Sequence, residues 1–130
     1  MKQAYGAVYA SRPAVMRSID GGKTWQDVSP QVGGAPTHPN TQDPYLYMDQ
    51  TTQRLFFVDY LGCYDISYSD DYGKTWTNDP PLCGWNLDHQ TLFAGPPVSS
   101  QTLNGYPNII YFCSIGGGAA TPTSTDTVCS

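Results

Sequence analysis

The sequence contains no glutamate. All 11 of its acidic side chains are aspartates, and with only 6 lysines and arginines the chain carries a net charge of −5. Charged residues make up 13% of the chain, and no run of lysine or arginine occurs. Because nucleic acid and anionic membrane surfaces attract basic proteins, neither is expected as a partner.

Long hydrophobic runs are missing too. No apolar segment approaches the roughly 20 residues that a membrane span requires, so no span is expected. Residues 1–11 lack the apolar core of a signal peptide, so a secretory leader would have to be removed or belong to a longer precursor. Helix formers are scarce, whereas glycine, proline, tyrosine, serine and threonine are abundant. This composition predicts an all-β protein.

The four cysteines lack the spacing of a zinc site. No Cys-x-x-Cys pair occurs, and no histidine is clustered with the cysteines. An even number of well-separated cysteines favours two disulfides, which form outside the cytosol. The cysteines therefore indicate an extracellular, secreted location.

One motif is present twice. The pattern Ser-x-Asp-x-Gly-x-Thr-Trp occurs at residues 18–25 and again at residues 69–76. Its fixed positions are Ser18, Asp20, Gly22, Thr24 and Trp25, and then Ser69, Asp71, Gly73, Thr75 and Trp76.

Every position of the motif has a structural explanation. Serine and aspartate side chains can accept hydrogen bonds from turn amides, and the glycine supplies a positive φ. The tryptophan can pack between strands beneath the turn. The alternative is that Asp20 and Asp71 are catalytic or bind calcium. It is less favoured, because a catalytic group is seldom duplicated at a repeat period.

Strand-like runs flank the motifs at a similar period. They cover residues 6–11, 43–49, 53–60, 88–95 and 107–114. Four short strands in about 45–54 residues is the size of one β-propeller blade, a four-stranded antiparallel sheet. The sequence thus predicts about two and a half blades: a partial blade at 4–30, a complete blade at 43–82 and a partial blade at 86–130. The strands expected in the complete blade are 45–48, 54–59, 64–69 and 75–78.

The repeated motif resembles the Asp-box, or BNR repeat, of sialidase-like β-propellers, a family that includes other glycosidases and sortilin-type receptors. Both copies match the motif fully, and the blade spacing extends the resemblance over essentially the whole chain. The resemblance implies that the motifs lie at the outer rim, between the third and fourth strands of a blade and far from an active site.

A sialidase of this family uses three arginines, a Tyr–Glu pair and an acid/base aspartate. The chain has only Arg12, Arg17 and Arg54, and it has no glutamate. Arg17 adjoins a motif and Arg54 begins a hairpin, so neither is expected in a central cluster. We therefore expect no complete sialidase site and no catalytic residue within one copy of the chain.

Another glycosidase would need two carboxylates across a sugar bond. Asp43 and Asp88 occupy matching positions where innermost strands begin. Together with His38, His89 and Arg12 they are the candidate ligand-binding residues, for a sugar or a cation. The simpler interpretation is that each aspartate closes a turn. Aromatic side chains could stack on sugars or fill the core, at Tyr45, Tyr47, Trp85, Phe93 and Tyr106. No cofactor is required, although calcium at Asp-lined turns is possible.

The blade arrangement also selects the cysteine pairs. Cys63 and Cys83 bracket the second motif on strands expected to be neighbours, and Cys113 and Cys129 fall on the second and third strands of the last blade. We therefore expect bridges Cys63–Cys83 and Cys113–Cys129, out of three possible pairings.

Incomplete blades leave sheet faces and edges bare. A neighbouring copy could cover them by head-to-tail association into a ring or a filament, or the rest of a longer propeller could do so. Three functions stay open: a structural or glycan-binding module that assembles with itself, a fragment of a secreted exo-sialidase or other glycoside hydrolase, and a receptor-like propeller that binds a peptide or protein.

Overall fold

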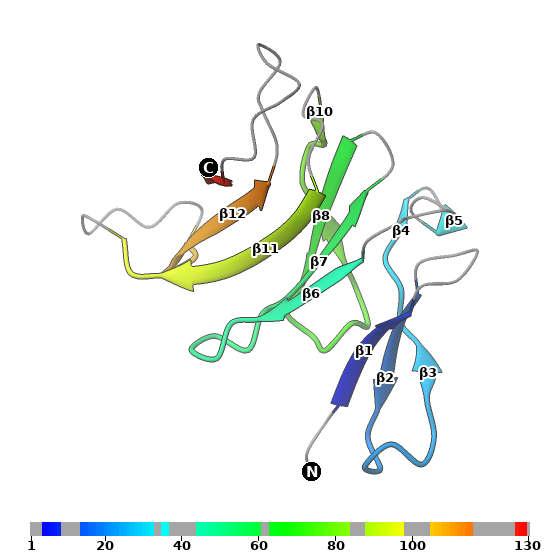
Figure 1. The fold of residues 1–130 in the computed structure, drawn as a ribbon. Helices are drawn as coiled ribbons and strands as arrows, with labels where there is room; N and C mark the ends of the chain where they lie inside the picture. Colours follow the sequence, from blue (N-terminus) through cyan, green and yellow to red (C-terminus); the bar gives the residue numbers. More distant parts are fainter. Residues whose placement is uncertain are drawn as a thin grey trace.

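In the computed structural model of the chain, the described residues are 4–8, 14–32, 35–36, 44–60, 63–83, 88–97, 105–115 and 127–129. These residues form β-strands and turns and no helix, so the all-β prediction is confirmed (Figure 1). It follows that, within these ranges, no helix is long and apolar enough to cross a membrane.

The strands form three antiparallel sheets and one short hairpin. The first sheet has the order β1-β2-β3, with β1 Ala4–Val8, β2 Ala14–Ser18 and β3 Gln26–Asp27. The central sheet comprises β6 Tyr45–Met48, β7 Leu55–Tyr60 and β8 Cys63–Ser69, with β9 Thr77–Asn78 and β10 Leu82–Cys83 both paired to β8. The third sheet has the order β11-β12-β13, with β11 Asp88–Gly95, β12 Ile109–Ile115 and β13 Thr127–Cys129. The hairpin pairs β4 Gln31–Val32 with β5 Ala35–Pro36.

Most strands form where the alternating apolar pattern predicts them. Strand β6 has the expected bounds, and β7 and β8 differ from expectation by one residue at their ends. Strand β9 begins at Thr77 rather than at residue 75, because the amide and hydroxyl of Thr75 both bond to Asp71 inside the preceding turn. Strand β1 runs over 4–8 instead of 6–11, and residues 9–11 lie outside the described ranges.

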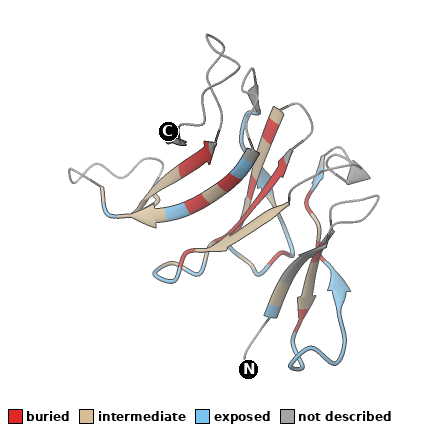
Figure 2. Ribbon diagram, viewed as in Figure 1, coloured by how far each residue is buried: buried red, intermediate tan, exposed pale blue. Residues whose placement is uncertain are grey.

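The three sheets pack face to face through two apolar clusters. Between the central and third sheets, Phe56, Val58 and Tyr64 contact Leu92 and Phe112. Figure 2 shows that buried residues concentrate in β7, β11 and β12, on either side of this junction.

The second cluster lies between the first and central sheets and contains Val15, Val28 and Phe57, with Leu46 and Trp76 packed against it. Because successive side chains of a strand point to opposite faces, β7 sends Phe56 toward the third sheet and Phe57 toward the first. Strand β7 is therefore covered on both faces.

The cysteines occupy paired register positions on neighbouring strands. Cys113 on β12 is the register partner of Cys129 on β13, and the expected disulfide joins them. Cys63 on β8 has Cys83 on β10 as its register partner, and Cys63 is disulfide-bonded. Both observations agree with the pairing expected from the sequence.

Candidate functional site

The two copies of the repeated motif have the same turn geometry. We call residues 18–25 the N-terminal motif and residues 69–76 the central motif. The Oγ of Ser18 accepts a hydrogen bond from the amide of Gly22 at 2.8 Å and donates one to Oδ1 of Asp20 at 2.9 Å. In the central motif, Ser69 bonds to Gly73 and Asp71 at the same two distances. Each serine thus links the end of a strand to the turn that follows it.

The motif aspartates are engaged by their own turns. Oδ1 of Asp20 accepts the Thr24 amide at 2.9 Å, and Oδ2 accepts the Thr24 hydroxyl at 2.7 Å. Asp71 accepts the same two groups of Thr75 at 2.8 and 2.7 Å. These hydrogen bonds, from the Thr24 hydroxyl first for Asp20 and from the Thr75 amide first for Asp71, lower the pKa of each carboxyl to about 2. A carboxylate held ionised and already bonded through both oxygens is poorly suited to proton transfer.

The glycines allow the turns to close. Gly22 and Gly73 have φ of 89° and 80°, a conformation that disfavours any side chain. Gly73 also meets the first sheet, because a Cβ placed on it would lie 3.0 Å from Cγ2 of Val28. At Gly22 the nearest atom to such a Cβ is Cζ2 of Trp25, at 3.7 Å. The central motif is therefore pressed against a neighbouring sheet.

The two tryptophans differ in the same way. Trp76 is half-buried, and its Nε1 donates to the carbonyl oxygen of Val28 at 2.7 Å, while its ring lies edge-on to Phe57 at 6.4 Å. Trp25 is 46% exposed, and its Nε1 bonds within its own turn, to the carbonyl of Gly22 at 3.0 Å. The burial expected for both tryptophans is thus reached only by Trp76, since Trp76 has a preceding sheet to pack against.

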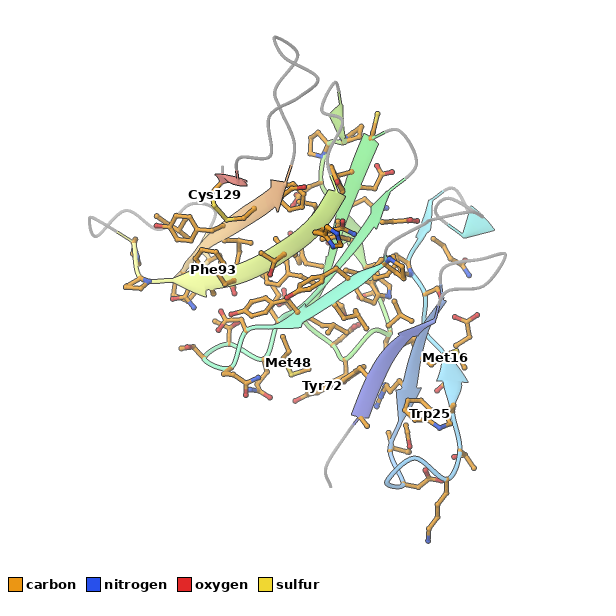
Figure 3. The ribbon with its side chains drawn as sticks, in the orientation of Figure 1. Met16, Trp25, Met48, Tyr72, Phe93 and Cys129 are labelled. Atoms are coloured by element: carbon orange, nitrogen blue, oxygen red, sulfur yellow. A yellow bond between two sulfur atoms is a disulfide. The ribbon has the colours of Figure 1, made fainter. Side chains whose placement is uncertain are left out.

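An aromatic pair on the third sheet, on the face turned away from the central sheet, is likewise more exposed than the equivalent pair of the central sheet. Phe93 on β11 stacks on its register partner Tyr111 with ring centroids 5.1 Å apart, and Phe93 is 45% exposed. The corresponding register pair of the central sheet is Tyr47 and Phe56. That pair is covered, because Tyr47 accepts a hydrogen bond from the Ala94 amide at 3.0 Å. Figure 3 shows Trp25 and Phe93 at opposite sides of the molecule.

A polar cluster, which the sequence did not predict, joins the central and third sheets. Asp49 follows β6 and is buried, and it accepts hydrogen bonds from the hydroxyl of Tyr106 and from Nδ2 of Asn108, the latter at 2.6 Å. Its other donors include the Thr51 amide at 2.9 Å and the Thr52 hydroxyl at 3.0 Å. We call these residues the Asp49 cluster.

The electrostatics of the Asp49 cluster oppose catalysis. Burial alone would raise the pKa of Asp49, but the hydrogen bonds from Tyr106, Thr51, Asn108 and Thr52 outweigh it and lower the pKa to about 2. Burial, reinforced by the bond to Asp49, raises the pKa of Tyr106 to about 12. Tyr106 therefore remains a phenol, whereas a nucleophilic tyrosine has to become a phenolate.

Arg54 is held beside this cluster. Its guanidinium lies 4.2 Å from the ring centroids of both Tyr68 and Tyr106, and it forms a two-point ion pair with Asp70, with both N–O distances 2.7 Å. The geometry matches the strong bidentate form of an Arg–carboxylate pair. Arg54 is thus committed to structure and is not available to bind a substrate carboxylate.

The candidate ligand-binding residues are not assembled within the part of the chain that the structure describes. Arg12, His38 and Asp43 lie outside the described ranges, as does Trp85. Asp88 begins β11, with Ile115 as its register partner. His89 is exposed, with φ of 53°, where the register shifts between residues 88 and 91.

The remaining aromatic candidates have structural contacts. Tyr45 accepts a hydrogen bond from the Thr91 hydroxyl at 3.0 Å, so Tyr45, Tyr47 and Tyr106 all contribute to the junction between the central and third sheets. Only Phe93 presents a largely open ring among the described candidates. Within the same ranges, no three His, Cys, Asp or Glu side chains are grouped so that they could hold a metal ion.

No family model matches the sequence, and neither a curated protein nor a solved structure shows significant similarity to it.

Proposed function

We propose that the chain is a segment of an Asp-box β-propeller of the sialidase-like type, and that it acts as an extracellular, non-catalytic module that assembles with further copies of itself. The three sheets would be consecutive blades. This is supported by their face-to-face order along the chain and by the central motif, which lies between β8 and β9. The disulfide between Cys113 and Cys129 supports an extracellular location.

One observation carries the assembly proposal. Trp76 and the Tyr47–Phe56 pair are each covered by an adjacent sheet, whereas at the two ends Trp25 and Phe93 are exposed, with Tyr111 half-buried beside Phe93. Each end thus presents one half of a junction that the molecule itself forms twice. We therefore expect the third sheet of one copy to pack against the first sheet of another copy.

The same contacts argue against hydrolysis by this chain. Arg54 is paired with Asp70, and Tyr106 is a phenol hydrogen-bonded to an ionised Asp49. The two motif carboxylates are engaged by their own turns. No observation on the described residues favours a hydrolase fragment or a peptide receptor over the assembly module.

The test is the absolute mass of the purified chain, measured by light scattering on a sizing column over a range of concentrations, with electron micrographs of any large species. Assemblies larger than one chain are expected, as rings if the rotation per copy closes and as filaments if it does not. Trp25→Ser and Phe93→Ser should each shift the mass toward the monomer.

Tyr72→Ser is the matched control. It also removes an exposed aromatic ring, but Tyr72 lies at the junction inside the molecule, where its carbonyl accepts a bond from Arg17. The assemblies formed by Tyr72→Ser should have the same mass as those of the unmodified chain. A folded monomer at every concentration would contradict the proposal, and so would equal effects of all three substitutions.

A further inference from the structure

A cleft of about 440 Å³ lies between the first and central sheets. One wall comes from residues 26–31, at and after β3, and the other from residues 73–76 of the central motif, with Arg17 contributed by β2. Figure 3 shows Tyr72, next to this wall, reaching the side of the first sheet. The volume is within the range of roughly 300–1,000 Å³ that small-molecule sites occupy.

Two cations line the cleft, Arg17 and Lys74. Among the residues that the structure describes, neither forms an ion pair with a carboxylate. Nη1 of Arg17 donates to the Tyr72 carbonyl at 3.2 Å, while its Nε is buried and has no hydrogen-bond partner in the described part of the chain. Because this Nε is not accessible to solvent, a ligand in the cleft would contact the terminal nitrogens of the guanidinium and not Nε.

The one acidic side chain in the lining is occupied. Oδ1 of Asp27 accepts the Ser29 amide at 2.9 Å and the Ser29 hydroxyl at 2.6 Å, which holds the carboxylate on its own strand end. The negative charge of Asp27 remains, but the two cations outnumber it, so the lining carries a net positive charge although the whole chain has a net charge of −5.

The rest of the lining fits a hydroxyl-rich molecule. Gln26 and Gln31 supply amides that both donate and accept hydrogen bonds. The indole of Trp76 has its N–H bonded to Val28, so it offers carbon surface to a ligand. Guanidinium and ammonium groups beside amides and an indole are the combination that would hold a charged sugar, with the oxyanion on the cations and the hydroxyls on the amides.

We propose that this cleft binds a small sugar that carries a single oxyanion group, either a carboxylate or a sulfate. Of the residues that the sequence suggested as a ligand rim, His89 is the one whose side chain the structure describes, and it does not line the cleft. The cleft also does not depend on assembly, because both of its walls belong to one chain.

The probe is titration of the ¹⁵N-labelled chain at low salt with glucuronate, with glucose 6-sulfate and, as the uncharged comparison, with glucose. We expect saturable amide shifts at Gln26, Gln31 and Lys74 with millimolar Kd for at least one charged sugar, and at least tenfold weaker binding of glucose. The tighter of the two charged probes identifies the oxyanion.

Lys74→Gln should weaken binding of the charged sugar about tenfold, and Arg17→Gln at least as much. Lys23→Gln is the matched control, since Lys23 holds the same position in the N-terminal motif but does not line the cleft. The proposal is overturned if no probe shifts these amides, if glucose binds as tightly as the charged sugars, or if Lys23→Gln weakens binding as much as Lys74→Gln. Light scattering of the same samples reports assembly separately, so failure of one proposal is distinguishable from failure of the other.

Discussion

The indole Nε1 of Trp76, just before β9 of the central sheet, and the carbonyl oxygen of Val28, just after β3 of the first sheet, lie 2.7 Å apart. The motif that contains Trp76 is closed by local hydrogen bonds. The bond from Trp76 to Val28 additionally connects this motif to the neighbouring sheet. The N-terminal motif has the same internal bonds and no such partner. Comparing the two copies therefore distinguishes the contribution of the motif to the stability of its own turn from its contribution to packing between sheets.

Replacing Trp76 by alanine should destabilise the fold much more than replacing Trp25. Trp76→Ala removes a half-buried ring at the junction with Val28 and Phe57, and losses of about 3 kcal/mol are usual for such truncations. Trp25→Ala removes a ring that is 46% exposed, so a loss of at most about 1 kcal/mol is expected. Denaturant unfolding at concentrations where both variants are monomeric measures the difference. Equal losses would mean that Trp76 does not fasten the two sheets.

The motif glycines offer a second paired comparison. Alanine at either Gly22 or Gly73 would be strained by the positive φ, which costs about 1–2 kcal/mol of stability. Gly73→Ala also forces a methyl group against Val28, 3.0 Å from Cγ2. Overpacking of this kind typically destabilises a fold by a further ~1–3 kcal/mol. The melting temperature of Gly73→Ala should therefore be lower than that of Gly22→Ala. Trimming the neighbour with Val28→Ala should reduce the difference between the two.

Acid should weaken the fold over a defined pH window. Asp20 and Asp71 have folded-state pKa values lowered to about 2, so below pH 4 the unfolded chain binds protons that the folded chain does not. Their stabilising contribution is present above about pH 4 and is lost as the pH falls toward 2. Unfolding free energies measured between pH 6 and pH 2 should show this decline. Asp71→Asn should be less stable at pH 6 and should show a shallower decline; an unchanged slope would assign the acid sensitivity to other groups.

The Asp49 cluster should produce an alkaline transition. Because the pKa of Tyr106 is raised to about 12 in the folded state, the phenol adds stability that is complete below about pH 10 and disappears as the pH rises through 12. Tyr106→Phe should cost roughly 1.5–3 kcal/mol, the range for a hydrogen bond to a charged group. It should also remove one late-titrating tyrosine, near pH 12, from the ultraviolet titration. Tyr111→Phe is the control, because its hydroxyl makes no hydrogen bond among the described residues; its stability and the titration near pH 12 should match those of the unmodified chain.

Local patterns made the strands and motif turns predictable. Apolar alternation located β6, β7, β11 and β12, and the serine, aspartate and glycine of each motif act on atoms at most four residues away, as turn chemistry requires. The strand pattern predicts a start of β9 at residue 75, two residues too early, because the pattern does not show that the side chain of Thr75 bonds back to Asp71.

Long-range contacts were not predictable in this way. Asp49 and Tyr106 are brought together by the packing of two sheets, and nothing in the sequence near either residue identifies the other. The exposure of Trp25 was missed for a related reason, since a motif specifies its own turn but not whether another sheet stands beside it. The cleft with Arg17 and Lys74 likewise exists only once the first two sheets are in contact.

The Cys113–Cys129 bridge has a mechanical consequence. Strand β13 pairs with β12 through only three residue pairs, and so short a ladder would peel away early under tension. The bridge transmits a pull on residue 129 covalently to Cys113, which is buried in the middle of β12. The load then spreads along a seven-residue strand instead of opening the edge of the sheet.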